Sequence, residues 1–315
     1  MTSHDELIGN QTRLESFGTF EISGVDAARF LQGQITINTD SIVENKLSLA
    51  AVCNPQGRCV AVFFATKKPG ASTQEAANQD TLSQNESNHD SFWFILPKDN
   101  IEATINHFKK YAVFFKTEIN DRTDSTNIYG TITDPKNSND SDNHKLINVT
   151  FTEPDSSIIM AVTKNAQAQA QSADQQAKTQ LTEQDWLFNV ASNGIPWISQ
   201  ASASHFLPHN LNLPTLEAVD FNKGCYTGQE VIARMQYKGK LKSHMQQFRC
   251  NVEINITTTD KIYVESQAAA EVICGATNHN GTSTLLALAK DRYLDAKIFR
   301  LNDENGPILE LVNYH

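Results

Sequence analysis

Apolar residues in the first half of the chain alternate between strand-like and helix-like spacing. The pattern predicts a strand over 15–22, then a turn and a helix that ends at Gly33. Apolar runs over 47–53 and 58–66 flank the turn sequence Asn-Pro-Gln-Gly and predict a β-hairpin. Strands and helices that alternate in this way favour an α+β fold with largely antiparallel sheets.

The same alternation continues beyond residue 91. A strand is predicted over 92–96, a helix over 98–110 and a further strand over 112–119. The helix is expected because Ile101, Ile105 and Phe108 recur at helical spacing.

Two later helices are predicted from capping boxes, in which a hydroxyl and an acidic side chain three residues later satisfy free backbone N–H groups. Thr182 and Asp185 form the first box, before a helix expected to end near Gly194. Thr227 and Glu230 form the second, before the short apolar run Val-Ile-Ala-Arg-Met.

The last part of the chain has a different pattern. From about residue 242 short alternating strands surround the turn pairs Asn280-Gly281 and Asn305-Gly306, which predict hairpins and a small all-β domain. Polar segments over 67–91, 134–145 and 164–180 contain few large apolar side chains, so we expect mobile loops there rather than domain boundaries.

Composition narrows the class of protein. The 315 residues are 39% hydrophobic and 20% charged, as in an ordinary globular protein. No apolar run approaches the roughly 20 residues needed to cross a bilayer, so we expect a cytoplasmic protein without a membrane partner. The formal net charge of −10 argues against broad, sequence-independent binding of nucleic acid.

Five widely spaced cysteines, with no Cys-x-x-Cys pair, are typical of reduced thiols. An iron–sulfur cluster usually needs four thiolates, so no stable metal of the protein's own is expected. His205 and His209 have the spacing of helical metal ligands, but Pro208 between them disfavours such a helix. The prediction is that the protein has no metal site.

The segment Lys-Gly-Cys-Tyr-Thr-Gly-Gln-Glu over 223–230, here called the signature segment, places one cysteine just before a predicted helix start. Free backbone N–H groups and the helix dipole favour the thiolate of Cys225 there, and Lys223 would add to the effect. Gly224 and Gly228 allow a tight turn and close approach of a ligand. The alternative is that Cys225 is a small buried hydrophobic residue in a structural turn.

The signature segment resembles that of the YgfZ group of folate-binding proteins, which are related to glycine-cleavage aminomethyltransferases. Blocks over 22–36, 54–65, 109–116 and 186–196 are similar to further family blocks, in the same order. The resemblance implies an aminomethyltransferase-like body of two intertwined lobes over 1–241 and a C-terminal β-barrel over 242–315.

The resemblance also implies site residues. An aromatic residue near the N-terminus and a tryptophan flank the folate pterin in the family, and Phe17 and Trp186 stand at these positions. Phe17 replaces the tryptophan of the bacterial archetype, so stacking survives but an indole N–H is lost. The resemblance marks Cys225 and Lys223 as the reactive pair, and the further residues expected to bind tetrahydrofolate or a derivative are Tyr226, Gln229, Glu230 and Arg234.

Three functions are compatible with these residues. The resemblance implies an accessory protein that supports iron–sulfur cluster assembly or repair, with iron–sulfur assembly proteins and clients such as tRNA methylthiotransferases as partners; direct tRNA binding is left open. An aminomethyltransferase is the alternative, although the segment Arg-Cys-Val-Ala-Val-Phe-Phe-Ala-Thr-Lys-Lys over 58–68 lacks the acidic pair of those enzymes. The third is a folate-binding module in which Cys225 is structural.

A basic cluster follows the signature segment. It comprises Arg234, Lys238, Lys240, Lys242 and His244. The cluster can attract the polyglutamate tail of a folate or an anionic partner. The alternative is a solvated basic linker between domains.

Overall fold

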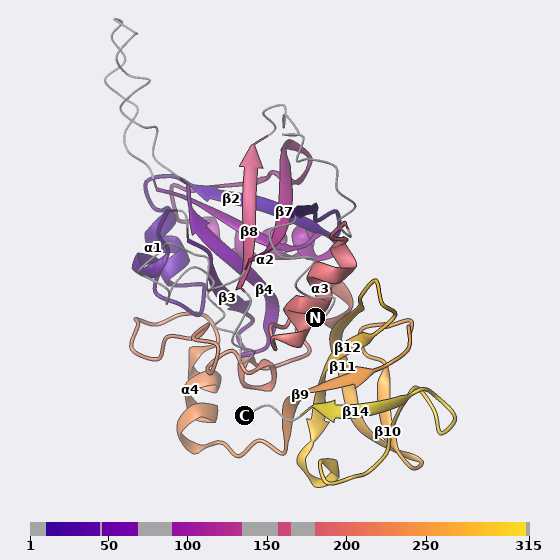
Figure 1. Ribbon diagram of the computed structural model, residues 1–315. Coiled ribbons are helices and arrows are strands. Elements are labelled where there is room, and N and C mark those ends of the chain that lie inside the picture. The colour runs from indigo at the N-terminus through magenta and orange to yellow at the C-terminus, as the bar shows by residue number, and fades with distance from the viewer. Residues whose placement is uncertain (1–10, 45, 69–89, 134–156, 165–179, 313–315) are drawn as a thin grey trace, which may run out of the picture.

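Two antiparallel sheets form the body of the protein. The computed structural model describes residues 11–44, 46–68, 90–133, 157–164 and 180–312 (Figure 1). The larger sheet has five strands in the order β3 (Ser48–Cys53), β4 (Cys59–Lys67), β5 (Ser91–Pro97), β2 (Phe17–Ser23) and β6 (Glu118–Asp121). The smaller sheet has three, in the order β1 (Gln11–Arg13), β7 (Thr126–Thr133) and β8 (Ser157–Lys164).

The C-terminal strands close into a barrel. Their order around it is β10 (Lys261–Val264), β11 (Gln267–Thr277), β12 (Ser283–Lys290), β9 (Ser243–Cys250), β14 (Ile308–Val312) and β13 (Phe299–Leu301). Closure leaves no unpaired sheet edge, which stabilises a small all-β unit. The predicted α+β class with antiparallel sheets and a C-terminal barrel is confirmed.

Four α-helices are described: α1 (Ala27–Gln32), α2 (Ile101–Ala112), α3 (Glu183–Ser192) and α4 (Gln229–Lys238). In Figure 1, α3 lies between the body and barrel strands β11 and β12, whereas α4 lies on the opposite side of the body from the smaller sheet. Helix α2 buries its predicted apolar face, Ile101, Ile105 and Phe108.

Two apolar cores hold the body together. One joins the larger sheet to α1 and α2, with Phe94 stacked on Phe20 at a centroid distance of 4.9 Å and edge-on to Phe63 at 5.0 Å. The other takes side chains from both sheets, α3, the signature segment and the barrel, including Met245 and Leu286 of β9 and β12. This central core fixes the barrel against the body.

Most elements predicted from the pattern are present within a residue or two. The strand at the N-terminus, the hairpin of β3 and β4, helix α2, helix α3 and the barrel hairpin turn at Gly281 are confirmed. The first barrel strand begins at Ser243, and the proposed domain limits stay a prediction. Most of the polar segment over 67–91, all of 134–145 and most of 164–180 lie outside the described residues.

Two predictions of elements were wrong. The segment 112–119, expected to be a strand, contains the end of α2 and a turn, and β6 begins only at Glu118. The apolar residues Val113 and Phe114 favour a strand in the sequence, but both are exposed in the turn. The capping box at Thr227 is also absent, because the residue before α4 is Gly228 in a left-handed conformation (φ 84°). The hydroxyl of Thr227 instead lies 3.3 Å from the side-chain oxygen of Gln34.

Candidate functional site

The signature segment is braced against the turn of the β3–β4 hairpin. A Cβ atom on Gly228 would lie 2.5 Å from the carbonyl oxygen of Asn54, and one on Gly57 would lie 2.9 Å from the side chain of Val231. Both glycines have positive φ, 84° and 74°, which other residues rarely adopt. The two turns can therefore pack backbone to backbone only because both positions are glycine.

Lys223 fixes the start of the segment from within. Its ammonium group donates to the carbonyl oxygens of Gln32 at 2.8 Å, Ile35 at 2.7 Å and Ile37 at 2.8 Å. These bonds join the signature segment to the end of α1. Burial lowers the pKa of Lys223 to about 8, opposed by Asp220, so the three-donor ammonium form still dominates at neutral pH.

Cys225 is a free thiol on the exposed side of this segment. It lies three residues before Gly228, one residue farther from the helix start than the capping-box prediction implied. A Cβ atom on Gly224 would meet no atom within 4 Å, so the space beside this neighbouring residue is open. Because the three N–H groups of Lys223 are occupied, a direct bond to the thiolate would have to replace one of them.

Tyr226 points the other way, into the central core. Its ring lies 4.9 Å from the ammonium nitrogen of Lys223, and burial raises the pKa of its hydroxyl well above the usual value, with contributions from Cys53 and Cys59. The two cysteines are fully buried, with their sulfur atoms 3.9 Å apart. The Tyr226 hydroxyl is buried without a hydrogen-bond partner in the described structure.

Phe17 and Trp186 lie in the same core. Their rings meet edge to face, with centroids 5.8 Å apart and planes at 87°. Trp186 is fully buried against β7, where a Cβ atom on Gly130 would lie 2.5 Å from the indole ring. The indole nitrogen has no hydrogen-bond partner among the described residues. The structure thus brings together three of the predicted cofactor residues, Phe17, Trp186 and Tyr226.

The remaining predicted residues lie on α4. Gln229 begins the helix and is half-buried, whereas Glu230 and Arg234 are exposed. These three side chains therefore lie at or outside the surface of the core that holds Trp186, and their role in binding stays a prediction.

Comparisons with known proteins show what the chain is similar to. The chain is 26% identical to the tRNA-modifying protein YgfZ of Colwellia psychrerythraea over 248 residues, which cover 73% of this chain and 68% of the relative. It is 26% identical to the YgfZ protein of Hamiltonella defensa over 320 residues, which cover 94% and 88%. The chain is a homologue of the YgfZ proteins. No family model matches it.

A solved structure confirms the fold expected of a YgfZ homologue. The aminomethyltransferase T of the glycine cleavage system from Bartonella henselae superposes with a TM-score of 0.58, over 99% of this chain and 87% of that protein, at 10% identity. At this identity the likeness shows the aminomethyltransferase-like fold alone. An uncharacterized protein of Haemophilus influenzae is also 26% identical, over 91% of both chains.

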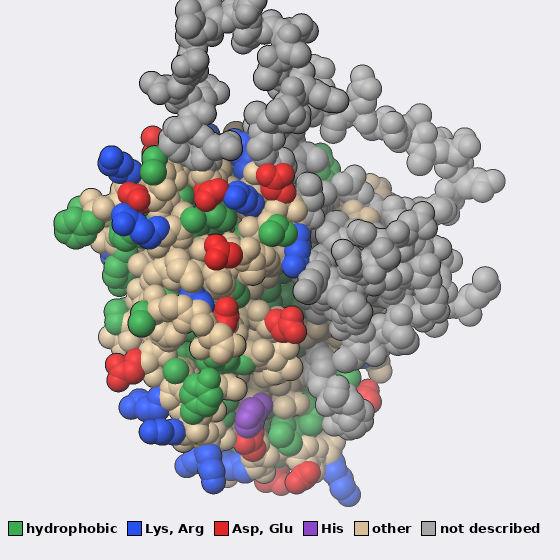
Figure 2. All heavy atoms as spheres, turned by 90° about the vertical axis from the view of Figure 1, so that its left-hand side faces the viewer, with side chains coloured by type: hydrophobic (Ala, Val, Ile, Leu, Met, Phe, Trp, Pro, Cys, Tyr) green, Lys and Arg blue, Asp and Glu red, His purple; other side chains and the backbone are tan. Residues whose placement is uncertain are grey.

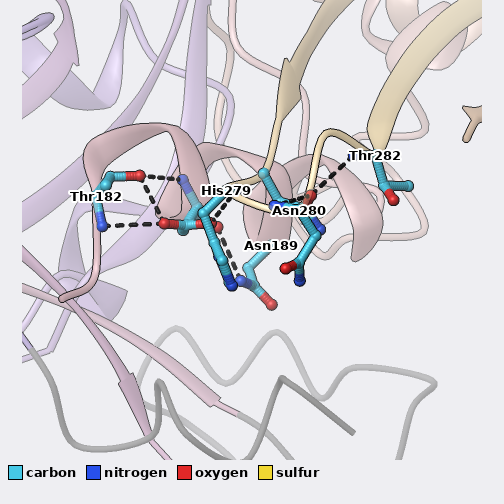
Figure 3. Close-up of polar contacts among 7 residues, drawn as sticks. Thr182, Asn189, His279, Asn280 and Thr282 are labelled. Carbon is cyan, nitrogen blue, oxygen red and sulfur yellow. Dashed lines mark hydrogen bonds and ion pairs between the residues drawn. The ribbon is translucent and has the colours of Figure 1, made fainter. Parts of the chain in front are cut away.

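One polar cluster of this YgfZ homologue was predicted only in part. The buried carboxylate of Asp185, next to Trp186, accepts bonds from the backbone and side chain of Thr182 at 3.1 and 2.6 Å, which confirms the predicted capping box. Its other oxygen accepts from the backbone N–H and ring Nδ1 of His279, at 2.8 and 2.7 Å (Figure 3). His279 belongs to the barrel turn 94 residues away, so no local pattern could reveal it.

This cluster holds the helix of Trp186 against the barrel, and it predicts a pH effect. Burial alone would raise the pKa of Asp185, but the bonds from Thr182 and His279 outweigh burial and lower it from 3.8. Because the folded pKa lies below the unfolded one, the stabilisation is present above the unfolded pKa and is lost as pH falls through the folded pKa.

Asp185→Asn is expected to lower the free energy of unfolding by about 3 kcal/mol at pH 7. The reason is that the amide NH₂ group of asparagine would face the hydrogen-bond donors of Thr182 or His279, where the carboxylate oxygen accepts. Urea unfolding at neutral and acid pH measures this, and the variant should lose less stability on acidification than the wild type. Asp291→Asn is the matched control, since Asp291 and His244 form an exposed pair at 2.6 Å. Equal stability of the two variants would contradict the role of Asp185.

The histidines weighed as metal ligands have other partners. His205 lies 2.9 Å from a carboxylate oxygen of Glu271, and His209 lies 3.1 Å from the side-chain oxygen of Gln236. No group of three or more His, Cys, Asp and Glu side chains suited to a metal ion occurs among the residues described. None of the described helices has the length and apolar character of a membrane span.

Proposed function

We propose that this chain is a folate-binding accessory protein that supports iron–sulfur cluster assembly or repair in client enzymes, and through them tRNA methylthiolation. The observation that carries the proposal is the exposed thiol of Cys225 on a segment held rigid by Lys223 and Gly228. A rigid, accessible thiol is suited to contact a partner's thiol or cluster, whereas a structural cysteine would be buried.

Buried polar atoms and aromatic rings of the central core support a folate site there. Trp186 and Tyr226 each carry a buried polar atom without a partner in the described structure, and a pterin offers polar groups that can satisfy them. Phe17 and Trp186 supply aromatic surface for the pterin. Their edge-to-face contact means that a pterin enters between them only if the rings move apart.

In this proposal Gln229, Glu230 and Arg234 contact the outer part of the folate, and tetrahydrofolate or a derivative is the bound form. Bound reduced folate would supply a carrier for one-carbon groups. These residues would hold the cofactor next to the segment that carries Cys225, and Tyr226 would couple folate binding to thiol chemistry.

The names of the relatives support the link to tRNA modification, since several are tRNA-modifying proteins named YgfZ. The proposed partners are iron–sulfur assembly proteins and iron–sulfur enzymes such as tRNA methylthiotransferases, in the cytoplasm. In this proposal the iron–sulfur cluster is either delivered to the client enzyme or already belongs to it, and Cys225 is the residue that contacts the cluster.

The aminomethyltransferase alternative is less well supported. The likeness to aminomethyltransferase T is one of fold, and fold does not determine activity. Strand β4 carries no Asp or Glu that could stabilise positive charge on a transferred group. A folate-binding module with a structural Cys225 is disfavoured by the exposure of that thiol.

Trp186→Phe is expected to weaken binding of tetrahydrofolate roughly tenfold, because it shrinks the stacking surface and removes the indole N–H. Isothermal titration of the full chain under reducing conditions measures this. Trp93→Phe is the matched control, since Trp93 is also buried with an unpartnered indole nitrogen but belongs to neither body core cluster. Unchanged affinity of Trp186→Phe, or equal losses in both variants, would contradict the assigned pocket.

A further inference from the structure

The outer face of α4 and the residues after it form an unpaired basic surface on an acidic protein. We call Arg234, Tyr237, Lys238, Lys240 and Lys242 the α4 basic face; all five are exposed. In the described part of the chain, none of its four cations forms an ion pair or a side-chain hydrogen bond, whereas the protein as a whole has a formal net charge of −10. Figure 2 shows Lys and Arg side chains gathered on the lower part of the face that carries α1 and α4.

Tyr237 distinguishes this face from a solvated basic linker. Its side chain is 71% exposed, yet its ring is supported edge-on by Phe221, with centroids 6.1 Å apart and planes at 67°. The ring centroids of Phe221 and His209 lie 6.3 Å apart, and a side-chain hydrogen bond joins His209 to Gln236 of α4. An aromatic ring that has an aromatic neighbour yet is largely exposed, with cations on both sides in sequence, is a platform on which a base can stack.

We propose that the α4 basic face binds a single-stranded segment of RNA, with phosphates on the lysines and one base stacked on Tyr237. This proposal rests on the proposed function in tRNA modification, and it names RNA as a ligand of the helix that follows the signature segment. RNA fits better than an acidic protein because carboxylates would use the cations but leave the open ring without a stacking partner. A single strand fits better than a duplex because paired bases are already stacked on one another.

The position of this face gives it a role. Cys225 is exposed and lies in the segment that leads directly into α4, so one short helix joins the thiol to the residues of the α4 basic face. RNA bound here would bring a client enzyme that carries the same RNA close to Cys225.

Fluorescence anisotropy of a labelled RNA stem–loop with an unpaired loop tests the proposal on the full chain. Tyr237→Ala is expected to weaken binding about tenfold at low salt. The double variant Lys238→Ser/Lys240→Ser is expected to reduce the slope of log affinity against log salt by about 1.4, since each phosphate contact to a single strand contributes about 0.7.

Matched controls lie elsewhere on the surface. Phe114→Ala removes an aromatic ring that is 89% exposed, and Lys109→Ser/Lys110→Ser removes two exposed lysines of α2. Both should bind RNA within about twofold of the wild type.

Four results would overturn the inference. The first is no binding of the stem–loop at about 50 mM salt, and the second is equal affinity of Tyr237→Ala and the wild type. The third is displacement of the RNA by a polyglutamate peptide at equal charge concentration. The third result would identify a polycarboxylate, either an acidic protein or the polyglutamate tail of a folate, as the ligand of this face. The fourth is binding of a blunt RNA duplex as tightly as the stem–loop. None of these outcomes changes the folate titration of Trp186→Phe, so failure here is separable from failure of the proposed function.

Discussion

Replacing Cys225 by serine is expected to abolish support of tRNA methylthiolation while leaving the protein folded. The thiol is exposed and makes no buried contact that the fold requires, so its thermal midpoint should stay within about 2 °C of the wild type. Serine nearly preserves the volume but cannot form the thiolate that contacts a partner thiol or a cluster. Thermal denaturation and the level of methylthiolated adenosine in tRNA of a complemented deletion strain measure both parts.

Cys250→Ser is the control for this experiment. Cys250 is buried in the barrel, so the substitution should lower stability but keep activity in the folded fraction. If Cys225→Ser complemented as well as the wild type, the thiol would be structural or dispensable. If Cys225→Ser unfolded, Cys225 would be needed for the structure of the signature segment, and unfolding rather than loss of the thiolate would explain the loss of activity.

Replacing Lys223 by methionine is expected to cause a large loss of stability, about 3 kcal/mol of unfolding free energy. The substitution keeps the length of the side chain but leaves the carbonyl oxygens of Gln32, Ile35 and Ile37 without their donor. Removing one partner of a buried charged interaction costs much more than removing an exposed charge. Urea unfolding followed by circular dichroism measures the difference.

The matched control is Lys109→Met on the exposed side of α2, which should leave stability unchanged. Loss of the Lys223 bonds in Lys223→Met should also release the signature segment. The rate at which iodoacetamide alkylates Cys225 should therefore change in this variant but not in the control. Stability equal to that of the control would show that the three carbonyl contacts are not formed in solution.

Local interactions explain what the sequence could predict. The Thr182–Asp185 capping box and the turn of the β3–β4 hairpin depend on residues within four positions of one another, and both were predicted correctly. The capping box at Thr227 has the same local pattern, but a tertiary contact overrides it: Gly228 must be left-handed to approach Asn54, so the helix begins one residue later.

Long-range interactions explain what the sequence could not predict. Lys223 was predicted to act on its neighbour Cys225, yet its ammonium group binds carbonyls that are 186 to 191 residues away in the chain. The bond between Asp185 and His279 spans 94 residues. The aromatic residues of the proposed folate site came from family resemblance, since a buried tryptophan in a helix has the same pattern whether it packs in a core or binds a ligand.

The arrangement suggests how the barrel contributes to the site. Asp185 joins the barrel turn to the helix that carries Trp186, and barrel side chains complete the core around Trp186. A shift of the barrel would therefore move the wall of the proposed folate site. Folate binding by Asp185→Asn should be weaker than by the wild type even under conditions where both are fully folded.

If the protein supports iron–sulfur enzymes that modify tRNA, loss of the protein should lower the methylthiolation of tRNA. Methylthiolated adenosine is quantified in tRNA from a strain that lacks this chain and from the same strain supplied with the wild-type chain. We expect a marked loss in the first strain and restoration in the second. An unchanged level of the modified nucleoside in the deletion strain would show that the protein has no such role.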